Sequence, residues 1–267
     1  MMNITPVVKQ LLIINIIFFI GSQMVPIAET YFSLYYFENP MFKFWQPLTS
    51  MFMHANVMHI FFNMFALYSF GSMLERFWGS SKFIFFYISC GLGSALLHSA
   101  VNYIEIHTLL NSVSELKLSS SDVTTLLNSD LRNVFDDDGK MVASSFQAIL
   151  ERVHCTQDQF NVIANANMVS RTPALGASGA VYGLLVAFAF MFPSAELALM
   201  FIPIPIKAKY FVSGLLLIDL VLGFKGSSIF GAGSTGVAHF AHIGGAITGF
   251  LMMWYWKKNQ FNKNRWN

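Results

Sequence analysis

The sequence carries little charge, and this lack excludes an ordinary soluble domain. Only 11% of its 267 residues are charged, whereas 55% are hydrophobic. A soluble globular domain carries about 25% charged residues. The formal net charge of +2 is also too small to indicate nucleic-acid binding. The composition therefore predicts a membrane protein.

Cysteine is equally scarce, and no metal-binding motif takes its place. Cys90 and Cys155 lie far apart, without a disulfide framework or a metal-ligand spacing. The zinc-protease motif H-E-x-x-H is absent. His239 and His242 stand three residues apart and are the minor metal alternative, because no carboxylate partner is evident. We expect no cofactor and no metal ion.

Long apolar runs dominate what is present. Crossing about 30 Å of hydrocarbon takes roughly 20 helical residues. The first run has no small-residue cleavage site at its end, so it is expected to be a membrane helix rather than a removed signal peptide. The predicted fold class is all-α, a polytopic membrane protein with a bundle of six transmembrane helices. The six stretches are Val8–Ala28, Val57–Leu74, Phe83–Val101, Leu175–Phe192, Tyr210–Phe224 and Val237–Trp256.

Two long connections interrupt this pattern. The segment 29–56 is rich in aromatic residues, which favour the headgroup zone, so we expect it to lie at the membrane interface. The segment 102–173 is a polar insertion with nine acidic and five basic residues and a net charge of about −4. Its apolar residues at helical spacing predict amphipathic helices: Leu109, Leu110 and Val113, then Phe146, Ile149, Leu150 and Val153. Its run Asp136-Asp137-Asp138-Gly139 predicts a turn. A calcium loop does not fit, because the alternating ligands and the closing Glu that it needs are absent.

These segments define a domain organisation and a topology. Residues 1–101 hold the first three helices, 102–173 an extracytoplasmic insertion, and 174–267 the last three helices and a basic tail. Lys and Arg concentrate on one side of the predicted bundle, which places both termini in the cytoplasm. That side holds Lys9, Arg76, Lys82, Lys207, Lys209, Lys257, Lys258, Lys263 and Arg265, against Lys43 and Lys225 in the other short loops.

Ser178 opens the fourth apolar stretch, directly after Gly176-Ala177. A helix N-terminus offers unpaired N–H groups and partial positive charge, so a nucleophile there has an oxyanion site in its own backbone. The alternative is an ordinary N-cap serine. The elbow motif of soluble hydrolases does not fit, because Ala180 occupies its last position.

His242 lies in the sixth stretch, where an ionisable side chain is costly and usually functional. Gly245 and Gly249 are four residues apart, as are Gly179 and Gly183, and small residues at that spacing let two helices approach closely. Close approach would bring Ser178 within hydrogen-bond reach of His242. The alternative is a packing contact between two helices in which a buried histidine is hydrogen-bonded to a carbonyl.

A third polar group lies in the second stretch. His59 and Asn63 are four residues apart and share one helix face. Both side chains can donate to a developing oxyanion.

Together these motifs resemble the rhomboid family of intramembrane serine proteases. They are the H-x-x-x-x-H-x-x-x-N run from His54 to Asn63, the G-x-S-G motif with Tyr182 four residues after the serine, and A-H-x-x-G-x-x-x-G from Ala241. They occur in the family's order on the second, fourth and sixth predicted helices, and the resemblance covers about residues 8–258 apart from the insertion.

The resemblance implies a role for each matching position. Ser178 is the implied nucleophile and His242 the general base, a dyad without a carboxylate. His59 and Asn63, with the Ser178 N–H, are the implied oxyanion donors. Tyr182 is implied to pack on the histidine ring. Gly176 is implied to permit close approach at the active loop, Gly245 and Gly249 to form the helix seam, and Glu75 and Arg76 to serve structure.

Three features depart from this pattern or lie outside it. The family often has Trp-Arg in the first loop, where this chain has Trp45-Gln46. The insertion of about seventy residues is unusual and leads into the active-site loop. Asp219, in the fifth stretch, is interpreted as a charge near the water-facing end of a short helix rather than as a gating or proton-transfer group.

The leading hypothesis is therefore a serine endopeptidase that hydrolyses peptide bonds in or near transmembrane segments of membrane proteins. Transmembrane protein substrates and membrane lipid are the expected partners, and nucleic acid is not. The alternative is a catalytically inactive rhomboid-like protein that binds membrane clients; a transporter is disfavoured because no internal repeat is found. The expected location is a bacterial inner membrane.

Overall fold

The computed structural model describes residues 3–136, 140–199, 202–225 and 237–257. These residues form helices and one two-stranded hairpin, which confirms the all-α fold class. The chain divides into two compact units. Unit 1 comprises residues 1–34, 44–98 and 174–267, and unit 2 comprises residues 35–43 and 99–173.

Unit 1 holds most of the apolar helices. Three helices among the described residues are long and apolar enough to cross a membrane: Pro6–Met24, Val57–Trp78 and Ser80–Ser112. Ser178–Met191 is a shorter apolar helix. The count of six spans stays a prediction. The helices of unit 1 are α1 (Pro6–Met24), α2 (Ile27–Phe32), α3 (Gln46–Thr49), η1 (Ser50–Phe52), α4 (Val57–Ala66), η2 (Leu67–Gly71), α5 (Ser72–Trp78), the first part of α6 (Ser80–Ser112), α10 (Ser178–Met191), α11 (Ala208–Lys225) and α12 (Val237–Trp256).

Buried and exposed apolar side chains divide these helices into inner and outer faces. The largest core cluster of unit 1 joins α1, α6, α10 and α12 through residues such as Leu11, Phe86, Leu184 and Met253. Large apolar side chains also remain exposed along α1, α11 and α12, for example Ile17 at 61%. Such a surface fits helices whose outer faces contact lipid.

A buried carboxylate fixes the start of α1. Glu75 of α5 is 2% exposed and accepts hydrogen bonds at 3.0 Å from the N–H groups of Val7 and Val8. Ser80 Oγ donates to the same carboxylate at 2.6 Å. Because the first N–H groups of a helix have no intrahelical partner, Glu75 satisfies donors that would otherwise be buried and unpaired. This contact agrees with the structural role expected for Glu75.

Several elements differ from the predicted ones, the third and fourth spans and the connection after α10 among them. The third predicted span, 83–101, lies within the 33-residue helix α6, which continues to Ser112 and so takes up the start of the predicted insertion. The fourth begins at Ser178 rather than Leu175. A hairpin that the sequence did not suggest, β1 (Glu196–Leu199) with antiparallel β2 (Ile202–Lys207), connects α10 to α11.

Unit 2 has its own apolar core. The predicted amphipathic spacing at Phe146, Ile149 and Leu150 is confirmed, since all three are buried in α8. They pack with Val113, Leu126 and other buried residues of the unit. Residues 137–139 of the predicted turn lie outside the described residues. The helices of unit 2 are the end of α6, η3 (Ser114–Leu116), α7 (Ser120–Asn128), η4 (Leu131–Asn133), α8 (Ser145–Arg152) and α9 (Gln157–Arg171).

Candidate active site

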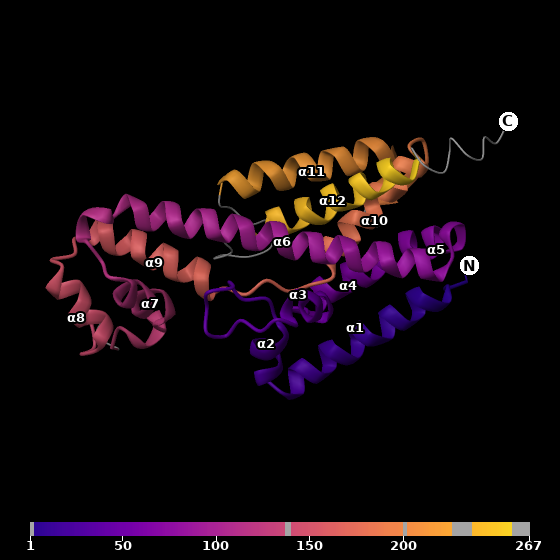
Figure 1. Cartoon of the computed structure of the whole chain (residues 1–267). Coiled ribbons are helices and arrows are strands. Elements are labelled where there is room, and N and C mark those ends of the chain that lie inside the picture. Colours follow the sequence, from indigo (N-terminus) through magenta and orange to yellow (C-terminus); the bar gives the residue numbers. More distant parts are fainter. Residues whose placement is uncertain (1–2, 137–139, 200–201, 226–236, 258–267) are drawn as a thin grey trace. The chain divides into compact units, whose positions relative to one another are not determined.

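Helices α10 and α12 approach until their backbones touch, side by side in Figure 1. A Cβ added at Gly245 would lie 2.6 Å from the carbonyl carbon of Gly179. A Cβ at Gly249 would lie 2.9 Å from the Cα of Gly183. No larger side chain fits at either contact, so the glycine spacing produces the close approach that the sequence suggested.

This approach brings the predicted nucleophile and base together. Nε2 of His242 lies 2.9 Å from Oγ of Ser178, within the 2.6–3.2 Å that proton transfer requires. Both side chains are partly buried. Ser178 is the first residue of α10, and the N-cap position before it is occupied by Ala177. The alternative reading of Ser178 as an N-cap residue is therefore wrong.

Tyr182 lies one turn after Ser178 and stacks on the imidazole of His242. Its ring centroid is 4.3 Å from that of His242, and the two planes differ by 10°. Parallel stacking restricts rotation of the imidazole about its side-chain torsions. The described geometry places Tyr182 where the resemblance implied it.

The loop before α10 is held by backbone hydrogen bonds. Leu34 and Ala174 exchange a pair at 2.8 Å, and the N–H of Gly176 donates to the Ser50 carbonyl at 2.9 Å. Gly176 has φ +122°, a conformation that favours glycine. A Cβ there would lie 2.7 Å from Nε2 of His59. Gly176 is therefore required both for the backbone turn and for the close approach of the imidazole.

His59 reaches this loop from α4. Asn56 is the N-cap residue of α4, and its side chain accepts a hydrogen bond from the His59 N–H at 2.9 Å in the first turn of the helix. The N–H of Ala55 donates to Nδ1 of His59 at 3.4 Å. A neutral imidazole that accepts at Nδ1 carries its proton at Nε2. His59 thus presents a donor beside Gly176, two residues before Ser178.

Asn63 is buried at 5% exposure, one turn further along α4. Its amide donates to the His59 carbonyl at 3.0 Å, so this hydrogen bond runs back along its own helix. The structure therefore brings Ser178, His242, Tyr182, Gly176 and His59 together. Asn63 lies one helical turn below that cluster with one of its two N–H groups already used.

The structure corrects the interpretation of Asp219. This residue of α11 is 4% exposed rather than near the surface. Its Oδ1 lies 2.5 Å from Nδ1 of His239 and 3.2 Å from Nδ1 of His242. The sequence also suggested that His239 and His242 lack a carboxylate partner, and Asp219 supplies one from another helix. The signal was available, since a carboxylate in an apolar helix needs a partner.

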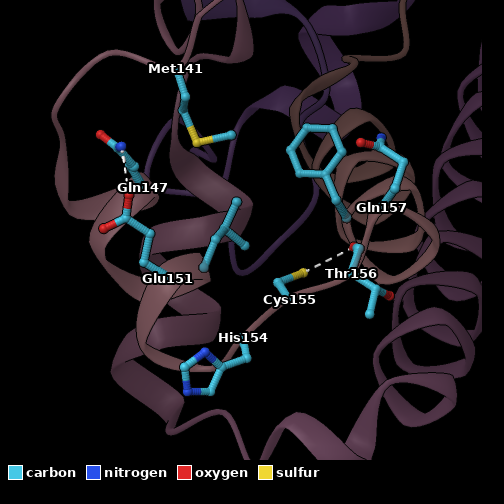
Figure 2. A pocket seen from close by; sticks show the side chains of 9 residues that line it. Met141, Gln147, Glu151, His154, Cys155, Thr156 and Gln157 are labelled. Atoms are coloured by element: carbon cyan, nitrogen blue, oxygen red, sulfur yellow. Dashed lines mark hydrogen bonds between the residues drawn. The ribbon is translucent and has the colours of Figure 1, made fainter.

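A separate cavity lies within unit 2 (Figure 2) and contains none of these residues. Its volume is about 540 Å³. Met141, Leu150 and Phe160 form apolar walls. Gln147 donates to Glu151 at 2.7 Å at its margin. Cys155, which also lines the cavity, donates to the Thr156 carbonyl, and burial raises the pKa of its thiol.

Known proteins resemble this chain in sequence. The rhomboid domain model matches residues 41–107 and 153–259, so that residues 108–152 of unit 2 fall between the two matched segments. An uncharacterized mitochondrial rhomboid protein of Schizosaccharomyces pombe is 26% identical over 226 residues, 81% of this chain and 52% of that protein. The chain thus spans about half the length of that relative.

Two further relatives align over shorter segments. Rhomboid protease GluP of Bacillus subtilis is 33% identical over 54 residues, 20% of this chain and 11% of that protein. Mitochondrial rhomboid protein 1 of Saccharomyces cerevisiae is 32% identical over 91 residues, 32% of this chain and 23% of that protein. Two of these three relatives are named mitochondrial, so they do not support the expected bacterial inner membrane. The matched family model and the helical bundle together show that this chain is a polytopic membrane protein and belongs to the rhomboid family.

Proposed function

We propose that this protein is an intramembrane serine endopeptidase that cleaves peptide bonds in or near transmembrane segments of other membrane proteins. The observation that carries the proposal is the 2.9 Å contact between Ser178 Oγ and His242 Nε2, at the mouth of an apolar helix. Family membership supports the reaction class, since one relative is named a protease.

The reaction proceeds in two acyl transfers. In the first, Ser178 Oγ attacks the scissile carbonyl carbon while its proton passes to Nε2 of His242. The C–N bond breaks, His242 returns the proton to the departing nitrogen, and an ester to Ser178 remains. In the second, water attacks the ester and gives a proton to His242. The C–Oγ bond breaks, His242 reprotonates Ser178, and the acid product leaves.

Negative charge on the carbonyl oxygen is stabilised by donors around Ser178. The backbone N–H of Ser178 lies at the start of α10, where no intrahelical acceptor exists for it. His59 offers Nε2–H beside Gly176. Asn63 contributes through its remaining N–H. Removing one such donor from a serine hydrolase costs about 10²- to 10³-fold in kcat.

The substrates are transmembrane proteins, and membrane lipid surrounds the enzyme. The resemblance implies substrates with small residues near the cleaved bond and a locally unstable helix. Helix α11 is the proposed lateral gate, although residues 226–236 of the connection that follows lie outside the described residues. The proposed topology places both termini in the cytoplasm, with Ser178 near the opposite face.

A fluorophosphonate probe tests the proposal, because it modifies activated serines. The wild-type protein in detergent is expected to be labelled, and Ser178→Ala is not. Ser213→Ala is the matched control, since Ser213 lies exposed on α11 and should leave labelling unchanged. Labelling that persists in Ser178→Ala would contradict the nucleophile assignment.

The base is tested separately with a substrate. A reconstituted single-span membrane protein should be cleaved by the wild type and not by His242→Ala. Cleavage that survives His242→Ala would remove His242 as the base. A wild-type protein that binds such a span without cleaving or labelling would instead be an inactive client-binding relative.

A further inference from the structure

Asp219 is a buried carboxylate for which the serine–histidine reaction described above has no use. It lies on α11 among apolar residues at 4% exposure. A buried charge is costly unless it is paired and hydrogen-bonded. Its partners are the two imidazoles of His239 and His242, both of which approach the same oxygen, Oδ1. Tyr182, from α10, also interacts with this carboxylate.

The two contacts decide where the histidine protons lie. An ionised carboxylate only accepts hydrogen bonds, so each imidazole donates from Nδ1. A neutral His242 with its proton on Nδ1 has a lone pair on Nε2. That lone pair faces Ser178 Oγ at 2.9 Å. The opposite tautomer would place a proton on Nε2 and could not take the serine proton.

We propose that Asp219 is a positioning residue that holds His242 in its basic tautomer and stabilises the imidazolium formed when Ser178 attacks. This inference rests on the proposed function and changes its dyad into a Ser178–His242–Asp219 arrangement. His239 anchors the carboxylate from the side, through its 2.5 Å contact with Oδ1. Stacking by Tyr182 restricts the ring plane, and Asp219 fixes which nitrogen carries the proton.

A metal ion is the competing use of the same three side chains. One ligand atom from each of Asp219, His239 and His242 lies within 4.8 Å of the others, and this donor set suits zinc. Ligands at about 2.0–2.1 Å in a tetrahedral zinc site stand roughly 3.3 Å apart. The 2.5 Å between Asp219 Oδ1 and His239 Nδ1 is too short for two ligands of one tetrahedral ion, and it lies nearer to the 2.7–3.2 Å of N–H···O hydrogen bonds. The geometry therefore favours positioning over metal binding.

The first test replaces the carboxylate by its neutral isostere. Asp219→Asn can turn an amide N–H toward His242 Nδ1 and so favour the unproductive tautomer. We expect kcat for cleavage of a membrane substrate to fall about 10³- to 10⁴-fold with KM unchanged, as for the aspartate of serine-protease triads. Asp219→Glu should restore part of the loss. Asp158→Asn, an exposed position on α9, is the matched control and should keep wild-type kcat.

The second test needs no variant of Asp219 and no activity. Nitrogen-15 NMR of histidine-labelled wild-type protein reports the His242 tautomer, with His242→Asn identifying its signals. The inference predicts a proton on Nδ1 and none on Nε2. A proton on Nε2, or zinc titration that binds stoichiometrically through the His239 and His242 Nδ1 atoms, would overturn it, as would wild-type kcat in Asp219→Asn. If the wild type neither cleaves nor labels, the proposed function fails, while the tautomer still decides the role of Asp219.

Discussion

Replacing Gly245 by alanine should separate α12 from α10 and thereby disable the site. Gly245 lies three residues after His242 on α12, and an added Cβ would stand 2.6 Å from the carbonyl carbon of Gly179. Ordinary van der Waals contact begins at 3.4 Å, and the Gly179 carbonyl oxygen would lie closer still, so the helices must part by more than about 0.8 Å at this point. The obstacle is backbone, which cannot turn aside as a flexible side chain can.

This separation sets the size of the effect. Moving His242 by nearly 1 Å would stretch its 2.9 Å contact with Ser178 Oγ beyond the reach of about 3.2 Å that proton transfer requires. A misplacement of about 1 Å can cost roughly 10²-fold in rate. Overpacking at the seam should also lower the free energy of unfolding by about 1–3 kcal/mol.

The assay is the rate of fluorophosphonate labelling, with thermal denaturation in detergent measured alongside. Gly214→Ala is the matched control, because nothing lies within 4 Å of a Cβ at Gly214 on α11. The control should label at the wild-type rate and gain about 0.5–1 kcal/mol of helix stability. If Gly245→Ala labels as fast as Gly214→Ala, the close backbone contact is not what aligns the site.

Three other perturbations have outcomes that the structure determines. Gly176→Ala forces a side chain into φ +122° and toward His59, so labelling should fall with a strain of about 1–3 kcal/mol; normal labelling would show that the loop accommodates it. Glu75→Ala leaves the first N–H groups of α1 without their acceptor, which should lower the free energy of unfolding by about 1–3 kcal/mol for each group. An unchanged thermal midpoint would argue against this cap. In unit 2, hydrogen bonding from Arg152 lowers the pKa of Asp122 to about 2. The stabilisation by this ion pair is therefore complete above the unfolded pKa of about 4, and it is lost as the pH falls toward 2. Hydrogen exchange of α7 and α8, corrected for intrinsic rates, should accelerate over that window in the wild type and lose this dependence in Asp122→Asn; equal pH dependence in both would contradict the assignment.

The sequence predicted the family and the contacts that depend on short-range spacing. Glycines four residues apart indicate a close helix contact, and a serine and a histidine on two such helices indicate where that contact places them. The structure adds a 2.9 Å distance between the two side chains. The packing of Tyr182 on the histidine ring followed from the family resemblance, and its place one helical turn after Ser178 agrees with it.

Asp219 shows where this reasoning fails. Its two imidazole partners lie on α12, at sequence separations of 20 and 23 residues, and no local pattern specifies how α11 is rotated against α12. Only that rotation decides whether a carboxylate faces lipid, water or an imidazole. The extension of α6 to Ser112 was missed for another reason: a helix that leaves the apolar zone keeps its hydrogen bonds while its side chains become polar, so hydropathy marks the span and not the helix end.

The central claim is that Ser178 is the nucleophile of a peptide-bond hydrolysis within a membrane. Its most direct test is cleavage of a single-span substrate co-reconstituted in lipid vesicles with either the wild-type protein or Ser178→Ala. We predict a defined cleavage product with the wild type and none with the variant. The same product at the same rate from both proteins would contradict the claim.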